Sequence, residues 1–363
     1  MWAASSERIA VDLRAGDDVR ESDRVCVCTA NPCRAVPWPA MSRNGICIAE
    51  MVLSAYPGLR RRAIVGRGKT LGDTEPVRQS NRISSRRTVI AFFTEPEPRR
   101  RVPLDVVPGV RRIVANNPGP LTYHGTNTYL VDDGRDLAVI DPGPDDDPGH
   151  VSAMIDYGGN RIAKIIVTHG HRDHVGCARA LASATGARIY GYQPSVCAEF
   201  VPDVALADGD VVAGMEVVHT PGHANDHICL ARDGVLFTGD HVMAWSSSFV
   251  ASPAGDMKDY FSSLRKVLDR DERLYLAAHG PPLREPALHV QQLLAGRLKR
   301  ETEILQFLEQ KGPATTAVLL GALYPRAVDE RIKRAAERTL QAHLLKLRAD
   351  GMARHDGALW SAN

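Results

Sequence analysis

The sequence of 363 residues lacks a long apolar run, and no stretch approaches the roughly 20 consecutive apolar residues that a membrane-spanning helix needs. Residues 1–18 also lack the apolar core of a signal peptide. These two absences exclude a membrane protein and a conventional secreted protein. We therefore expect a soluble, cytoplasmic protein with no membrane partner.

Cysteine is scarce and scattered. The seven cysteines are an odd number, and Cys177, Cys197 and Cys229 lie inside apolar runs, so we expect buried thiols in a reducing compartment rather than disulfides. The amino-terminal cysteines have a spacing that none of the common zinc sites uses, and we predict no metal there: Cys26, Cys28, Cys33 and Cys47.

Histidine is absent from residues 1–100, although the chain has 13 histidines. This segment has 17 Lys and Arg, of which 16 are Arg, against 11 Asp and Glu, and no helical or alternating apolar period persists in it. We interpret residues 1–100 as an amino-terminal extension that is either disordered or the product of an over-called translation start. Residues 101–296 carry 16 Lys and Arg against 24 Asp and Glu, so the middle of the chain is acidic.

The most informative stretch is THGHRDHVG, residues 168–176, which holds four residues of metal-ligand type within six positions. An apolar run over residues 161–167 predicts a buried strand before it, and a helix is predicted from Asp173. Imidazole and carboxylate suit zinc, iron or manganese, and a strand end followed by a helix start can direct several side chains to one point. The ligand-type residues are His169, His171, Asp173 and His174.

Every further predicted strand end carries another residue of this type. Asp141 follows a strand over residues 136–140, His223 follows 211–219, Asp240 follows 235–238, and His279 follows 274–278. Strand ends at one edge of a sheet lie close together, so we expect one shared site. The mixed order of strands and helices predicts an α+β protein built as an αβ/βα sandwich.

These motifs resemble the metallo-β-lactamase superfamily over about residues 101–290, which we take as the catalytic domain. The resemblance implies a four-layer αβ/βα sandwich and a dinuclear, metal-dependent hydrolase that uses a metal-bridging hydroxide. It implies two divalent metal ions, with zinc preferred over iron or manganese. One ion would be held by His169, His171 and His223, and the other by Asp173, His174 and His279; Asp240 would bridge them, and Asp141 would support the loop from behind.

Asp173 and Asp240 would act as catalytic ligands. His227 would face the substrate or support a ligand, and an ordinary loop histidine is the equal alternative. Penicillin-degrading members typically have Cys where this chain has Asp240, which argues against an antibiotic-degrading role. Closer phrases, including residues 116–131, 219–230 and 237–248, resemble the beta-lactamase-like protein 2 group. This resemblance implies an endoribonuclease-like phosphodiesterase acting on single-stranded RNA; the alternative is a small-molecule thioesterase or esterase of the glyoxalase II type.

The carboxy-terminal residues 291–363 are predicted to form a linking helix and a winged helix. Helices are predicted over residues 293–308, 315–323 and 329–349, followed by a hairpin over 352–360. Twelve Lys and Arg against eight Asp and Glu in residues 297–363 would suit a nucleic-acid backbone. The alternative for this domain is that it only packs on the catalytic domain or forms a homodimer. A third hypothesis for the whole protein, besides the two hydrolase hypotheses, is that it acts chiefly as a nucleic-acid-binding regulator.

Overall fold

The computed structural model describes residues 94–325 and 329–363. The predictions for residues 1–93, including the cysteines and the over-called start, lie outside the described residues. Residues 94–100 contact the catalytic domain: the backbone N–H of Thr94 donates to Tyr123 Oη at 2.6 Å, and Glu95 forms an ion pair with buried Arg112 at 3.1 Å. The folded region therefore includes Thr94 and Glu95, earlier than the predicted boundary at residue 101.

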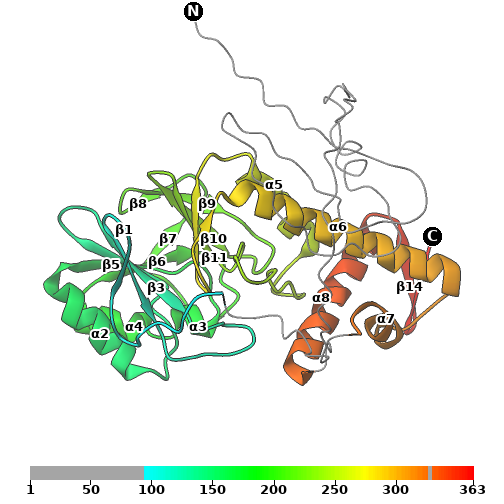
Figure 1. Ribbon diagram of the computed structural model, residues 1–363, viewed down its shortest axis with the longest axis horizontal. Coiled ribbons are helices and arrows are strands. Elements are labelled where there is room, and N and C mark those ends of the chain that lie inside the picture. The colour runs from blue at the N-terminus through cyan, green and yellow to red at the C-terminus, as the bar shows by residue number, and fades with distance from the viewer. Residues whose placement is uncertain (1–93, 326–328) are drawn as a thin grey trace, which may run out of the picture. The chain divides into compact units, whose positions relative to one another are not determined.

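A seven-stranded sheet forms one half of the catalytic domain (Figure 1). Its strands lie side by side in chain order, antiparallel from β1 to β4 and parallel from β4 to β7. Parallel neighbours need crossover connections. These contain helices between β4 and β5 and between β5 and β6, whereas residues 193–203 connect β6 to β7 without a helix. The strands are β1 (Leu104–Val107), β2 (Val110–Val114), β3 (Asn127–Asp132), β4 (Leu137–Ile140), β5 (Ile162–Ile166), β6 (Arg188–Tyr192) and β7 (Val204–Leu206).

A six-stranded sheet in the order β13-β12-β11-β10-β9-β8 forms the other half. Its neighbours are antiparallel except for β11 and β12, which are parallel because a helix connects them. The strands are β8 (Val211–Val212), β9 (Met215–His219), β10 (Ile228–Arg232), β11 (Val235–Gly239), β12 (Leu274–Ala277) and β13 (Leu283–Arg284).

Alternation along the strands builds the core. Tyr129 and Val131 of β3 pack between the two sheets, against residues such as Phe237 of β11. Leu130, between them in the sequence, packs on the opposite face with Met154 of the outer helices. Successive side chains of a strand point to opposite faces, so each apolar strand contributes to two cores at once.

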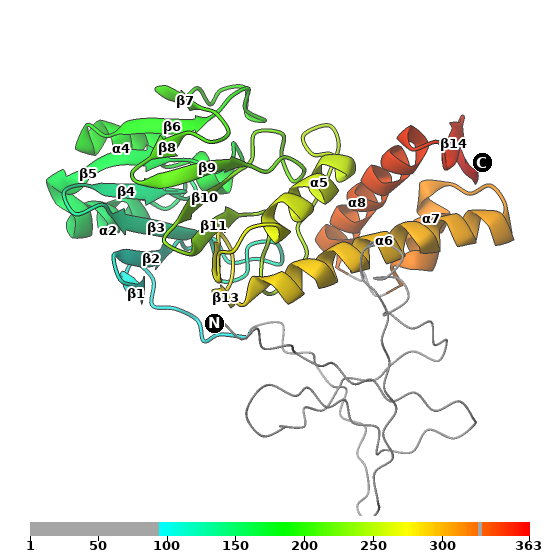
Figure 2. The same cartoon turned by 90° about the horizontal axis from the view of Figure 1, so that it is seen from above.

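Helices cover both outer faces, which completes the predicted four-layer sandwich (Figure 2). Helices α2 (Pro148–Gly158) and α4 (Ala178–Thr185) pack on the seven-stranded sheet. Helix α5 (Met257–Leu268) packs on the six-stranded sheet. The Asp147 carboxylate caps α2, and Pro148 occupies its first turn, as the sequence predicts.

The carboxy-terminal region is the predicted winged helix. It consists of α6 (Pro286–Lys311), α7 (Thr316–Leu323), α8 (Glu330–Ala349) and the hairpin of β14 (Ala353–Asp356) and β15 (Leu359–Ala362). Trp360 is buried with Leu340 and Leu344, so the hairpin packs on α8. Among the described residues, no helix combines the length and apolar character needed to cross a bilayer.

Several element boundaries differ from prediction. The helix predicted from Asp173 is split into α3 (Arg172–Val175) and α4, because the Cys177 backbone N–H donates to the Gly143 carbonyl at 2.9 Å. The strand predicted over residues 211–219 is a hairpin of β8 and β9 that turns at Ala213 and Gly214, both with positive φ. Helix α6 begins at Pro286 rather than 293, and the short strands β7 and β13 were not predicted.

Candidate metal centre

Asp141 directly follows β4 and supports the histidine-rich loop from behind. Its Oδ1 accepts a hydrogen bond from the Thr168 backbone N–H, and its Oδ2 accepts one from the Thr168 hydroxyl, both at 2.8 Å. The same Oδ2 lies 3.0 Å from His174 Nδ1. This contact orients the ring so that His174 Nε2 faces the other ligand-type side chains.

Three histidines direct ring nitrogens at one point. His169 and His171 follow β5, and His223 follows β9. His169 Nε2 lies 2.9 Å from His171 Nδ1, and His223 Nε2 lies 3.2 Å from His169 Nε2 and 3.0 Å from His171 Nδ1. This triangle of nitrogens is a geometry in which three lone pairs can share one cation.

A second group lies beside the first. His279, which follows β12, places Nε2 at 3.3 Å from Asp173 Oδ2, and His174 Nε2 lies 3.6 Å from the same oxygen. Both imidazoles are fully buried, whereas the Asp173 side chain is 31% exposed. Asp173 is therefore the member of this group that solvent reaches most easily.

The Asp240 carboxylate lies between the two groups. Its Oδ2 is 3.6 Å from His223 Nε2 and 3.6 Å from His174 Nε2, and its Oδ1 is 3.4 Å from His279 Nε2. Asp240 follows β11, and His279 follows the neighbouring parallel strand β12. The two side chains therefore lie close together at adjacent strand ends. The seven predicted ligand residues thus converge at one edge of the sandwich.

Burial and neighbouring charge set the protonation of the cluster. Burial first, and then the surrounding histidines, lowers the pKa of His169 well below its usual value. The same causes lower the pKa of His171 to about 4, and burial lowers that of His223. These three imidazoles are therefore neutral at pH 7, the form that ligates a metal.

The second group has the opposite electrostatics. Burial acts to lower the pKa of His174, but Asp173, Asp240 and Asp141 more than offset it and raise the pKa well above the usual value. The pKa of His279 is raised by Asp240 and Asp173 in the same way. The carboxylates thus create a strongly negative local field that favours a bound cation.

His227 lies behind Asp240. The Asp240 backbone N–H donates to His227 Nε2 at 3.1 Å, and His227 Nδ1 lies 2.9 Å from the Thr220 hydroxyl. A nitrogen that accepts from a backbone N–H carries no proton, so the proton is on Nδ1. His227 is fully buried, so this geometry favours support of Asp240 over contact with a substrate.

Sequence reasoning missed two supporting groups. Asp226 Oδ2 accepts from the backbone N–H of Gly170 at 2.9 Å and of Val196 at 3.2 Å, which ties the histidine loop to the segment after β6. The Phe249 carbonyl accepts from His223 Nδ1 at 2.5 Å. A single loop aspartate is a weak signal, and a backbone carbonyl has no sequence signal.

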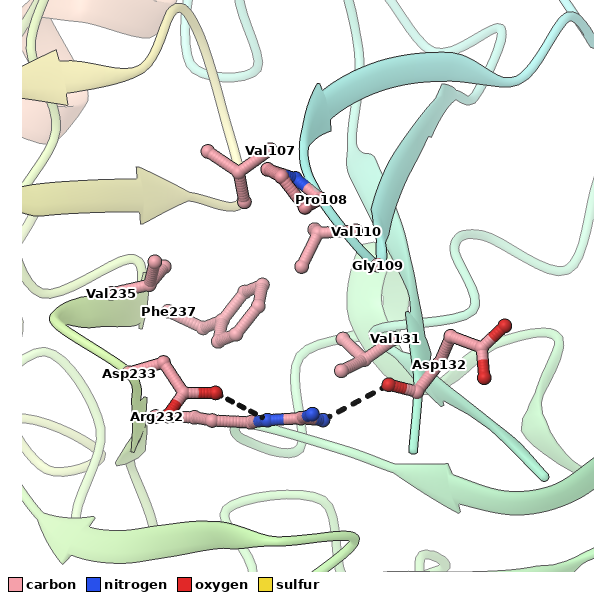
Figure 3. A pocket seen from close by; sticks show the side chains of 10 residues that line it. All are labelled: Val107, Pro108, Gly109, Val110, Val131, Asp132, Arg232, Asp233, Val235 and Phe237. Atoms are coloured by element: carbon pink, nitrogen blue, oxygen red, sulfur yellow. Dashed lines mark hydrogen bonds and ion pairs between the residues drawn. The ribbon is translucent and has the colours of Figure 1, made fainter. Parts of the chain in front are cut away.

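Figure 3 shows a pocket of about 410 Å³ lined by apolar side chains such as Val110, Val131 and Phe237. Arg232 lies at its edge, with Nε 3.0 Å from Asp233 Oδ2 and a guanidinium nitrogen 3.1 Å from the Asp132 carbonyl oxygen. Asp132 ends β3 and Val235 begins β11, whereas the ligand residues follow the ends of β4, β5, β11 and β12. The pocket therefore lies at the opposite edge of the sandwich from the candidate metal centre.

Comparison with known proteins agrees with the fold and with the two-domain architecture. The metallo-beta-lactamase superfamily profile matches residues 121–207 and 198–279, and that of the beta-lactamase associated winged helix domain matches residues 315–360. A metallo-beta-lactamase family protein of Thermus thermophilus has a similar fold, with a TM-score of 0.60, 24% identity, and coverage of 71% of this chain and 99% of that one.

Two curated relatives align over about two thirds of this chain. The "Beta-lactamase-like protein 2 homolog" of Drosophila melanogaster is 31% identical over 268 residues, which cover 68% of this chain and 89% of that protein. The "Atrochrysone carboxyl ACP thioesterase" of Passalora fulva is 29% identical over 262 residues, which cover 68% of this chain and 77% of that protein. The chain therefore belongs to the metallo-β-lactamase superfamily, as a metal-dependent hydrolase of the beta-lactamase-like protein 2 type with a carboxy-terminal winged helix.

Proposed function

We propose that the cluster binds two divalent metal ions and that the protein uses them to hydrolyse an acyl thioester or ester. The observation that carries this proposal is the convergence of five imidazoles and two carboxylates in two adjacent groups with Asp240 between them. His169, His171 and His223 would hold one ion, Asp173, His174 and His279 the other, and Asp240 both.

Buried polar atoms support the fit of this site to metal ions. His174 Nε2 and Asp240 Oδ1 are buried and make no hydrogen bond among the described residues, because their nearest ion-pair neighbours lie 3.4–3.6 Å away. A buried polar atom without a partner costs roughly 1–3 kcal/mol, so a site with two of them is expected to have a ligand. In the first group, ring nitrogens of His169, His171 and His223 face one another, and a cation between them would explain this arrangement.

When bound, such ions lower the pKa of a shared water and polarise the bond to be broken. Asp240 would hold the separation between the two groups, and His227 would keep Asp240 in place through its backbone N–H. Asp173, the more exposed carboxylate, would orient the attacking water by accepting a hydrogen bond from it. Asp141 would maintain the ring orientation of His174.

Zinc is our proposed metal, because a site dominated by imidazole suits it, and iron and manganese are the alternatives that metal analysis would distinguish. The free thiols Cys177, Cys197 and Cys229 support a reducing, cytoplasmic location. The predicted homodimer is a matter for a solution mass measurement.

The packing of α8 supports a thioester or ester substrate. In helix-turn-helix proteins the recognition helix enters the major groove of DNA. Here Ala342 of α8 lies in the core beneath α5, and the His343 ring lies 6.5 Å from the Phe261 ring. This half of α8 is therefore occupied by the catalytic domain. The excess of acidic residues in 101–296 and the relative named as a thioesterase point in the same direction.

Single-stranded RNA is the second candidate substrate, and a different part of α8 favours it. Arg331, Lys333 and Arg334 are exposed in the first turns of the helix. Arg338, in the next turn, lies over the Phe249 ring at 5.6 Å, and the carbonyl of Phe249 contacts the ligand residue His223. Cations near the metal centre could guide a phosphate backbone to it.

Parallel assays of a fluorescent single-stranded RNA, an acyl thioester and an aryl ester would test both candidates on protein of measured metal content. Asp240→Ala should abolish hydrolysis, whereas Asp271→Ala, at an exposed aspartate on the segment before β12, is the matched control and should retain it. Thioester or ester turnover lost only in Asp240→Ala supports the proposal. RNA cleavage with this dependence, and no ester turnover, would transfer the assignment to the second candidate; equal turnover in both variants would refute the metal site itself.

A further inference from the structure

A long loop between β11 and α5 passes beside the metal centre and carries the Phe249 carbonyl. This carbonyl accepts a hydrogen bond from His223 Nδ1 at 2.5 Å. The bond holds the proton of His223 on Nδ1 and leaves Nε2 to face His169 and His171. A partner of this kind fixes both the tautomer and the ring orientation of a metal-ligating histidine.

Residues outside the catalytic domain hold this loop. Arg297 of α6 donates from Nη2 to the carbonyl of Ser248, the residue before Phe249, and its guanidinium lies 5.4 Å over the Tyr260 ring of α5. Arg297 is only 8% exposed. The loop continues into the core at Val250, which is fully buried against α5.

Helix α8 contacts the loop at the neighbouring position. Arg338 lies 5.6 Å over the Phe249 ring, although it is itself exposed and so contributes less than Arg297. The two arginines therefore come from different helices of the carboxy-terminal region and engage two successive loop residues. A hydrogen bond from a buried guanidinium to a carbonyl is stronger than one between neutral groups, and it replaces water that would otherwise solvate that loop carbonyl.

We propose that the carboxy-terminal region is part of the metal centre, with Arg297 as a positioning residue that, with help from Arg338, places the Phe249 carbonyl so that it holds His223 for metal binding. This inference rests on the proposed assignment of His223 as a ligand. It gives the linking helix and the winged helix a role in metal affinity, whatever substrate they meet.

Arg300, one turn further along α6, provides a matched control. It also donates to a backbone carbonyl, that of Leu323, at 2.8 Å, and lies over an aromatic ring, that of Tyr324, at 4.2 Å. Both of these partners belong to the carboxy-terminal region. Arg300→Ala therefore removes contacts of the same kind, together with an ion pair to Glu303 at 2.9 Å, without touching the loop that carries Phe249.

The test compares Arg297→Ala and Arg300→Ala with wild type by chelator competition for Zn²⁺ and Co²⁺, by the visible absorption of the Co²⁺ form, and by thermal melting. We expect Arg297→Ala to lower the affinity of the weaker-binding ion by about 10- to 100-fold and to alter the Co²⁺ spectrum. Arg300→Ala should have a lower melting temperature than wild type, whereas its metal affinity and its Co²⁺ spectrum should match those of wild type.

Equal affinities and spectra in Arg297→Ala and wild type would overturn the inference, as would an equal loss in Arg300→Ala. If Arg297→Ala does not fold, Arg297→Lys makes the same comparison, because it keeps the charge and the aliphatic stem but lacks the planar fork. A wild type that binds no metal would instead refute the metal assignment itself, so the two failures are distinguishable.

Discussion

At the scale of single residues, the candidate metal centre consists of the ligand-type side chains and of the groups that hold them in place. Asp141, His227 and the Phe249 carbonyl each contact one ligand residue on the side away from the other ligands. Asp141 was predicted from the sequence in this supporting role, whereas the sequence left the role of His227 open. Its hydrogen bonds to Asp240 and Thr220 favour support of Asp240.

Asp141→Asn should reduce metal affinity by about 10- to 100-fold, because His174 loses the charged partner that orients it and strengthens it as a ligand. Chelator competition would measure the change. Asp145→Asn is the control, since Asp145 is exposed and pairs with Arg172 rather than with a ligand. An Asp141→Asn protein with wild-type affinity would show that Asp141 only shapes the loop.

His150 should make stability depend on pH. Burial lowers its pKa to about 4, against a smaller opposing effect of Asp147, with Arg101 acting in the same direction as burial. Between pH 6.5 and 4 the unfolded state then binds more protons than the folded state. The full contribution of neutral His150 is therefore present above pH 6.5 and is lost as the pH falls to about 4, on the order of 3 kcal/mol.

Thermal melting from pH 7 to pH 4 would show this effect when wild type and His150→Gln are compared in the same metal state. Glutamine can still donate to the Thr128 hydroxyl, which His150 Nε2 contacts at 2.7 Å, but it does not titrate. The decline in melting temperature should be shallower in His150→Gln. Parallel declines would mean that other groups cause the acid sensitivity.

At the scale of elements, the residues of the candidate site lie at strand ends and in the loops that follow them. Close backbone packing against neighbouring elements fixes the path of these loops. Gly222, directly before the ligand residue His223, has φ of 140°, and an added Cβ would lie 2.3 Å from the Cα of Tyr260 in α5. Only glycine fits here, because both the backbone angle and the space exclude a side chain.

Gly222→Ala should therefore destabilise the protein by at least about 2 kcal/mol, through backbone strain and overpacking against α5. It should also weaken metal binding by displacing His223. Gly296→Ala is the control: Gly296 lies within α6 with open space around the added Cβ, so alanine should stabilise the helix by about 0.5–1 kcal/mol. Denaturant unfolding would measure both, and a neutral Gly222→Ala would contradict the packing argument.

At the scale of the whole molecule, the two domains share packing and are expected to unfold together. Ala342 of α8 lies in the same core cluster as Val290 of α6 and Phe261 of α5. Glu301 of α6 also bonds to His343 Nδ1 at 3.1 Å and to Lys346 Nζ at 2.9 Å, which joins α6 to the buried side of α8. The winged helix is thus continuous with the catalytic domain.

Removing metal with a chelator should lower the melting temperature of both domains together, in a single transition. Ions that bind only the folded state stabilise it by about 4 kcal/mol at a thousand times their dissociation constant. Added Zn²⁺ should restore the original melting temperature. Calorimetry that shows two transitions, of which only one responds to chelator, would contradict the shared packing.

The sequence by itself predicted the candidate ligand residues and determined the sandwich. The residues His169 to His174 are close in sequence, and the other ligands end predicted strands, so local pattern was sufficient. The predicted helix boundaries were wrong where a contact with a distant residue ends a helix. At Cys177, the backbone N–H donates to the Gly143 carbonyl instead of to a carbonyl of the preceding helical turn.

Only the tertiary structure decided which groups contact the candidate ligand residues and how the carboxy-terminal region packs on the loop beside them. The Phe249 carbonyl is a backbone group, which any residue at that position would supply, so no sequence pattern marks it. In the sequence, Arg297 is indistinguishable from the other basic residues of its helix. It contacts Ser248, 49 residues earlier in the chain, only because α6 packs beside that loop. Contacts of this range depend on how the elements pack together, which local propensity and periodicity do not specify.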